Sequence, residues 1–317
     1  MQKPSASSSI LPEQAAYLIA LMVLVFISGC GDVAADPQLH FRRFDAWKVP
    51  ANGHHLPAPR ALYSDEADTV YALDDAGRVL VYSPKGELLR SWFMPEYSIG
   101  RAEGIIKLLD GRLAVADTHY HRVVIFDADE SGAVSYMFGT EGNEDGQFIF
   151  PVSIAQDPAG FLYVGEYGEK QRIQKFTVEG TYVSQFGSHG TDEGQFQRPS
   201  AIVWRDQKIF AVDAFNNRIQ VFTDDGNFER VIELSPASAP LAYPYDLKVL
   251  PDGRMFVVEN KGSRVTIMHD DGTIEGRFGK PSRGVDGFYT PWAIAVLSDG
   301  RILVGDTGNH RLVELTP

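Results

Sequence analysis

The chain has 317 residues, with 29 basic and 42 acidic side chains, a formal net charge of −13 and 44% hydrophobic residues. The single cysteine excludes an intramolecular disulfide framework and any zinc or iron–sulfur site built from several cysteines. A charge this negative argues against a protein that binds a phosphate backbone, so no nucleic-acid partner is expected.

The amino terminus has the pattern of an export signal. An uncharged apolar run over residues 15–28 is long enough for a signal-peptide core and too short to span a bilayer as a helix. It ends in Ile27-Ser28-Gly29-Cys30, which resembles the lipobox of bacterial lipoproteins, where the cysteine is lipidated and becomes the first mature residue. We expect a lipoprotein signal peptide over residues 1–29, a lipid on Cys30 and a tether over residues 30–39. An uncleaved anchor or a plain secretory signal is the alternative.

The residue after the cysteine bears on the destination of the protein. Gly31, in place of an aspartate, resembles lipoproteins that are sent to the outer membrane. We expect an exported protein that a lipid holds at a bacterial membrane, facing the periplasm or the exterior, with the outer membrane favoured.

One phrase then recurs six times along the chain. An alternating strand ends in an acid, a short polar loop follows, and an arginine opens a second alternating strand. Successive marker arginines are 44, 50, 46, 46 and 47 residues apart, a regularity that indicates internal repeats. These arginines are Arg78, Arg122, Arg172, Arg218, Arg264 and Arg311.

Each repeat predicts a small antiparallel sheet. Apolar residues alternate with a period of two, and Asp-Gly turns separate four short strands, as in residues 245–279. Such a sheet cannot bury both of its faces alone, so the copies should stack radially, and six of them close into a ring. The predicted fold is an all-β, six-bladed β-propeller of four-stranded antiparallel blades over residues 40–317.

The two ends of this region support a closed ring. The sixth repeat stops at Pro317, one strand short of a complete blade, while residues 40–49 form an extended segment that no repeat claims. We expect this N-terminal segment to complete the last blade, which hides two strand edges and closes the ring without a covalent bond.

The repeats also resemble a known family. The segments DTGNHRL (306–312), FGTEGNEDGQF (138–148) and FGSHGTDEGQF (186–196) resemble the NHL repeat, and the resemblance covers residues 40–317. It implies the six-bladed propeller. It leaves the function open, because NHL propellers serve as lyases, sensors, RNA readers and interaction platforms.

Acid–arginine pairs are the most regular polar feature of the repeats. A carboxylate that ends one strand can meet the guanidinium that begins the next and can also accept loop amides, so a structural role is expected. The first repeat has Leu73 at the acid position and Asp74 one place later, so its loop should be held differently. The pairs are Asp117 with Arg122, Glu166 with Arg172, Asp213 with Arg218, Glu259 with Arg264, and Asp306 with Arg311.

Two stretches of the sequence resemble metal sites. Residues 127–138 begin like a calcium loop but end in Phe138 where a bidentate glutamate is needed, and they coincide with an outer hairpin of the repeat. His119 and His121 lie beside Asp117 and could form a small site, although solvated loop histidines are the more ordinary interpretation. We expect no metal and no cofactor.

The residue that opens each innermost strand should border the central channel, on the face that carries the acid-to-arginine loops. Amidating lyases with this propeller hold zinc through histidines that follow a proline at this position, and this chain has none there, so no such zinc site is expected. Only Glu103 offers a carboxylate to a lactonase-type divalent cation. The ring reads Arg60, Glu103, Val152, Ser200, Tyr245 and Trp292.

The channel face combines aromatic and mixed-charge side chains, which suits recognition. We therefore expect a non-catalytic propeller that binds a protein, peptide or glycan of the cell envelope on this face. Three alternatives stay open: Tyr245 and Trp292 simply plug the channel, the propeller is a scaffold in an envelope complex, or Glu103, Asp117, His119 and His121 build an atypical metal-dependent lyase or lactonase-like hydrolase. The candidate binding residues are Arg60, Glu103, Tyr120, Tyr167, Phe215, Tyr245 and Trp292.

Overall fold

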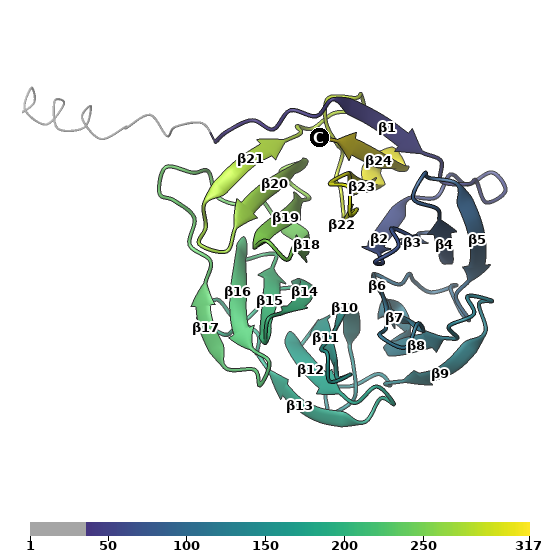
Figure 1. The fold of residues 1–317 in the computed structure, drawn as a ribbon. Helices are drawn as coiled ribbons and strands as arrows, with labels where there is room; N and C mark the ends of the chain where they lie inside the picture. The colour runs from purple at the N-terminus through teal and green to yellow at the C-terminus, as the bar shows by residue number, and fades with distance from the viewer. Residues whose placement is uncertain (1–35) are drawn as a thin grey trace, which may run out of the picture.

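The computed structural model describes residues 36–317, which form a closed ring of six four-stranded antiparallel sheets (Figure 1). The first strand of each sheet lies nearest the centre of the ring and the last strand lies at its rim. The predicted all-β, six-bladed β-propeller is confirmed. Within this part of the chain, no helix has the length and apolar character needed to cross a bilayer. The expected signal peptide and Cys30 lie outside the described residues.

The blades follow one another in chain order, and each runs from the channel outward. The first three are β2 (Pro59–Ser64), β3 (Val70–Asp74), β4 (Arg78–Tyr82) and β5 (Leu88–Phe93); β6 (Gly104–Lys107), β7 (Leu113–Asp117), β8 (Arg122–Phe126) and β9 (Val134–Phe138); and β10 (Phe150–Gln156), β11 (Leu162–Tyr167), β12 (Arg172–Phe176) and β13 (Tyr182–Phe186).

The other three blades have the same order of strands, except that the outermost strand of the sixth comes from the amino-terminal end. They are β14 (Pro199–Arg205), β15 (Lys208–Asp213), β16 (Arg218–Thr223) and β17 (Phe228–Val231); β18 (Pro244–Val249), β19 (Arg254–Glu259), β20 (Arg264–His269) and β21 (Ile274–Phe278); and β22 (Ala293–Val296), β23 (Ile302–Asp306), β24 (Arg311–Thr316) and β1 (Arg43–Trp47).

The ring closes through the segment that the sequence left unassigned. Strand β1 pairs antiparallel with β24, from Arg43 opposite Thr316 to Trp47 opposite Leu312. Figure 1 shows β1 along the outside of the last blade, between β21 and β5. This pairing covers the edge that β24 would otherwise expose, so the prediction for the last blade is confirmed.

Residues before β1 also hold the fifth blade. Asp36 forms a 2.7 Å ion pair with Arg277 of β21, and both side chains are buried. Arg277 N–H donates to the Pro37 carbonyl, and Leu39 N–H donates to the Arg277 carbonyl. Residues 36–39, which the sequence assigned to the tether, are therefore packed as part of the folded ring and fasten its last two blades together.

Apolar side chains from neighbouring sheets form one core at every blade interface. Between the sixth and first blades, Trp47 and Leu303 pack with Leu62, Val70 and Leu80. Each sheet is buried between two others, so strands such as β7 and β23 have no exposed face, although each has only five residues. A single blade lacks this core because half of it belongs to the neighbouring sheet.

Candidate functional site

The acid–arginine pairs fasten the loops of one face of the ring. In the fourth blade, Arg218 Nε donates to Asp213 Oδ2 over 2.8 Å, and Asp213 Oδ1 accepts the Gln197 backbone N–H at 2.7 Å. Arg218 Nη2 also donates to the carbonyls of Asp192 and Gln195. One pair thus ties the loop after the second strand to the linker that enters the same blade.

The same arrangement recurs, and the four other pairs close at 2.6 to 2.9 Å. The carboxylate is buried in every case, and in three of these four blades it accepts a backbone N–H from the incoming linker. These pairs are Asp117 with Arg122, Glu166 with Arg172, Glu259 with Arg264, and Asp306 with Arg311.

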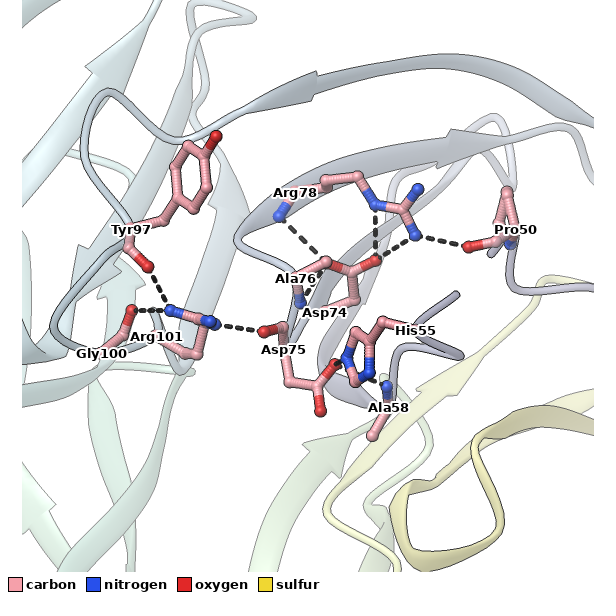
Figure 2. A network of polar contacts seen from close by, with 10 residues as sticks. All are labelled: Pro50, His55, Ala58, Asp74, Asp75, Ala76, Arg78, Tyr97, Gly100 and Arg101. Atoms are coloured by element: carbon pink, nitrogen blue, oxygen red, sulfur yellow. Dashed lines mark hydrogen bonds and ion pairs between the residues drawn. The ribbon is translucent and has the colours of Figure 1, made fainter. Parts of the chain in front are cut away.

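The first blade divides this task between two adjacent acids, as Figure 2 shows. Arg78 donates from Nε and Nη2 to Asp74 Oδ2 at 2.9 and 2.7 Å. Asp75 Oδ1 instead accepts the Ala58 N–H of the incoming linker at 2.9 Å and lies 2.9 Å from Nε2 of His55. The shorter loop after β3 therefore achieves the same fastening with different residues.

In the second blade, the carboxylate of the acid–arginine pair does not bond the incoming linker. Asp117 bonds Arg122 at 2.9 Å, but the linker N–H of Arg101 contacts Nδ1 of His119 rather than this carboxylate. Burial raises the pKa of Asp117 to about 6 from an ordinary value of 3.8, and the ion pair with Arg122 offsets only part of this effect.

Glu103 lies at the centre of a polar cluster that closes one end of the channel. Its Oε1 accepts a 2.6 Å hydrogen bond from Arg60 Nη2, and its Oε2 accepts a 2.9 Å bond from the Tyr245 hydroxyl. Arg198 Nη2 donates to the same hydroxyl over 2.8 Å and lies 3.5 Å from Glu103 Oε2. Two guanidinium groups thus share one carboxylate, which leaves the cluster with one positive charge.

Aromatic rings pack around these two arginines. The Arg60 guanidinium lies 3.8 Å from the ring centre of Trp292, and Arg198 lies 4.1 Å from that of Tyr167. Tyr245 packs against Trp292 with a centroid separation of 4.7 Å. The cations are therefore held by charge, hydrogen bonds and ring faces together.

An arc of further aromatic residues lies outside this plug. Phe150 stacks on Tyr167 at 4.9 Å, and Phe215 packs on Tyr243 at 5.2 Å. Phe215 is the most open member, with 54% of its surface exposed. We call Tyr120, Phe150, Tyr167, Phe215 and Tyr243 the aromatic rim.

The structure divides the seven candidate binding residues into two groups. Tyr120, Tyr167 and Phe215 belong to the aromatic rim. Glu103 and Tyr245 are only 9% and 5% exposed, and with Arg60 and Trp292 they form the plug. The plug residues are brought together as the ring position predicts, but they present little surface to a large partner.

Three residues of this region were not predicted from the sequence: Phe150, Arg198 and Tyr243. Each directly precedes the proline near the start of an inner strand, namely Pro151, Pro199 and Pro244. The predicted channel residues are those that follow the prolines, so the residues that precede them were not predicted, although both positions recur with the same period.

The residues of the alternative metal site do not converge. Glu103 contacts two arginines, whereas Nδ1 of His119 and of His121 contact the backbone carbonyls of Arg101 and Ile149 respectively. In the calcium-like stretch, Asp127 accepts a hydrogen bond from Ser135 within the outer hairpin. In the part of the chain from residue 36 onward, no group of three or more His, Cys, Asp and Glu side chains is arranged to hold a metal ion.

Relatives of known sequence agree with the repeat interpretation. The model of the NHL repeat matches residues 288–315. Protein brain tumor from Drosophila melanogaster is 30% identical over 145 residues, which cover 45% of this chain and 14% of that protein. Peptidylglycine alpha-amidating monooxygenase from Rattus norvegicus is 24% identical over 272 residues, covering 81% of this chain and 26% of that protein. The matched regions thus span about a quarter or less of these relatives.

Solved structures share the architecture. Virginiamycin B lyase from Staphylococcus aureus superposes with a TM-score of 0.61 at 15% identity, covering 88% of this chain and all of that one. A luciferin-regenerating enzyme superposes with a TM-score of 0.60 at 13% identity, covering 82% and 91%. Likeness at this level of identity shows the fold alone. The matched repeat and the ring of six four-stranded blades together support an NHL-type β-propeller.

Proposed function

We propose that this chain is a non-catalytic, lipid-anchored NHL propeller that binds a protein, peptide or glycan of the cell envelope on the face formed by the acid-to-arginine loops. The observation that supports the proposal is that the carboxylate of Glu103 is already engaged by neighbouring side chains. Its carboxylate already serves Arg60, Arg198 and Tyr245, so the one acid of the inner ring is committed to holding the plug.

The aromatic rim is the contact surface that remains. Phe215 and Tyr243 pack on each other and offer flat apolar area, and the guanidinium of Arg198 lies over the adjacent Tyr245 ring. Aromatic and arginine side chains contribute most to binding at interfaces. The buried acid–arginine pairs hold the loops beneath this surface, so little ordering entropy is lost when a partner docks. A protein or peptide is the partner that this combination suits best.

The proposed anchor rests on the sequence and on where the folded ring begins. Cys30 precedes Asp36 by six residues, which can reach at most ~20 Å when extended. Asp36 is fixed to Arg277 at the rim of the fifth blade. A lipid on Cys30 would therefore keep that edge of the ring close to the membrane surface.

A photo-crosslinking amino acid placed at Phe215 tests the binding face in intact envelopes. The matched control carries the same amino acid at Val183, which is exposed on the outer strand β13. We expect a defined adduct from position 215 and none from position 183, and mass spectrometry identifies it as protein, peptide or glycan.

The interaction is then measured with the purified partner. Phe215→Ala should weaken binding by about tenfold, the loss typical of an aromatic contact at an interface, and Val183→Ala should leave it unchanged. Equal adducts from both positions, or unchanged binding by Phe215→Ala, would contradict the proposal. Elemental analysis addresses the enzyme alternative, since stoichiometric zinc or calcium that is lost on Glu103→Gln would favour a metal-dependent lyase or hydrolase.

A further inference from the structure

The channel holds a cavity of about 290 Å³ behind the plug. Arg60, Glu103, Tyr245 and Trp292 line its inner end, where most of the side-chain surface is buried. Leu109, in the turn between β6 and β7, also lines the cavity and is 71% exposed. The cavity therefore opens on the face opposite the aromatic rim.

Several hydrogen-bond donors in the cavity wall lack a partner in the part of the chain that the structure describes. Ser200 is 7% exposed, lines the cavity, and its hydroxyl has no hydrogen bond within the described chain. The same holds for Nε of Arg60 and for the indole Nε1 of Trp204, which belong to two other lining residues. A buried polar atom without a partner costs free energy, so these groups are suited to a ligand that accepts hydrogen bonds.

The carboxylates in the cavity wall are already paired with basic side chains. Glu103 is shared by two arginines, and Asp246 lies 3.1 Å from Lys248 Nζ. Asp246 also accepts the Ile294 backbone N–H at 2.9 Å. The inner end therefore retains the single positive charge of the plug, although the chain as a whole is strongly acidic.

The wall between the two ends is apolar. Leu62, Ile105, Ile154 and Ile202 line it, and each is at most 5% exposed. A ligand that fits this cavity needs an apolar body and an anionic end that reaches the donors, because small-molecule sites combine apolar walls with a few converging polar groups.

We propose that this cavity binds a small organic anion, a monocarboxylate with an apolar body, which enters from the side of Leu109. The carboxylate accepts hydrogen bonds from Ser200 Oγ and Arg60 Nε, and the body contacts the isoleucines of the wall. This site lies beyond the proposed partner surface and does not depend on it.

Calorimetric titration of the purified full chain with benzoate tests the site, with benzamide as the neutral probe of the same shape. Detergent solution without protein gives the background heat. We expect benzoate to saturate one site and benzamide to bind at least about tenfold more weakly, because it lacks the charge that the plug attracts.

Two serine variants distinguish an effect on ligand binding from an effect on the stability of the fold. Ser200→Ala should weaken benzoate binding about tenfold without lowering the melting temperature, because the hydroxyl it removes has no hydrogen-bond partner within residues 36–317. Ser153 lines the same cavity, but its Oγ accepts the Ile202 N–H at 2.9 Å. Ser153→Ala should therefore lower the melting temperature and change benzoate affinity by less than about twofold.

Three results would overturn the proposal: no saturable benzoate binding, equal affinity for benzamide, or unchanged benzoate affinity in Ser200→Ala. Phe215→Ala should bind benzoate like the unmodified protein, since its side chain lies on the other face. A failed crosslink at Phe215 therefore counts against the partner surface alone, and failed benzoate binding counts against the cavity alone.

Discussion

The Tyr245 hydroxyl donates a 2.9 Å hydrogen bond to Glu103, a residue 142 positions earlier in the chain. The bond joins β18 of the fifth blade to the segment just before β6 of the second blade, across the channel. Burial and the nearby Glu103 carboxylate raise the pKa of Tyr245 well above 10, so the phenol keeps the proton that it donates. The plug is thus a cross-link between opposite blades.

Glu103→Gln should destabilise the ring by about 3 kcal/mol, because it leaves two largely desolvated guanidinium groups, each less than a fifth exposed, without a countercharge. Urea unfolding at neutral pH measures the change. Glu229→Gln is the control, since its 2.8 Å pair with Lys208 is partly exposed and should contribute under about 1 kcal/mol. Equal effects of the two substitutions would show that the plug does not stabilise the fold.

Truncation before residue 48 should release both closing contacts, the β1 pairing with β24 and the ion pair of Asp36 with Arg277. The exposed edge of β24 should promote association, and the melting temperature should fall. Size-exclusion chromatography and thermal unfolding compare this variant with a truncation before residue 36, which retains both contacts. A monomer of unchanged stability after the longer truncation would refute closure by β1.

Asp117 should make the protein less stable as the pH rises from about 4 to 6. Its folded-state pKa of about 6 exceeds its ordinary value of 3.8, so in this window the folded state binds more protons than the unfolded state. Relative to Asp117→Asn, the unmodified protein should lose about 3 kcal/mol of unfolding free energy across the window.

Asp110→Asn is the opposite control for this pH series. A hydrogen bond from Arg112 lowers the pKa of Asp110, so its contribution should be lost as the pH falls below about 4. Chemical unfolding of all three proteins from pH 3 to 8 gives the two profiles. If the difference between the unmodified protein and Asp117→Asn is flat from pH 4 to 6, the carboxylate is not perturbed by burial.

Gly104→Ala should cost about 2 kcal/mol, because a Cβ at this position in β6 would lie 2.5 Å from the Val152 carbonyl oxygen of β10. Gly165→Ala in β11 is the matched control, since its nearest contact would be the Ile202 Cγ2 atom at 3.6 Å. Thermal unfolding should place the first variant well below the second. Equal melting temperatures would mean that the blades move apart without cost at this point.

The acid–arginine pairs show how far repeat reasoning extends into the tertiary structure. Asp213 and Arg218 stand opposite each other in adjacent strands, so their contact follows from local register. The first blade departs from this pattern, because Asp74 and Asp75 divide the role that Asp213 fills alone. The sequence predicted a different loop there, but not which atoms each acid would engage.

The number of blades, the four strands in each, and closure by the amino-terminal segment could all be predicted from the sequence, because strand alternation, turns and repeat spacing are properties of the chain read locally. The plug and the cavity were decided by the closed ring. Arg198 reaches Glu103, a residue 95 positions earlier, only when the blades converge on the channel, and that convergence leaves Ser200 buried without a hydrogen-bond partner among residues 36–317. Contacts of this kind depend on how the sheets pack around a common centre, which no single repeat encodes.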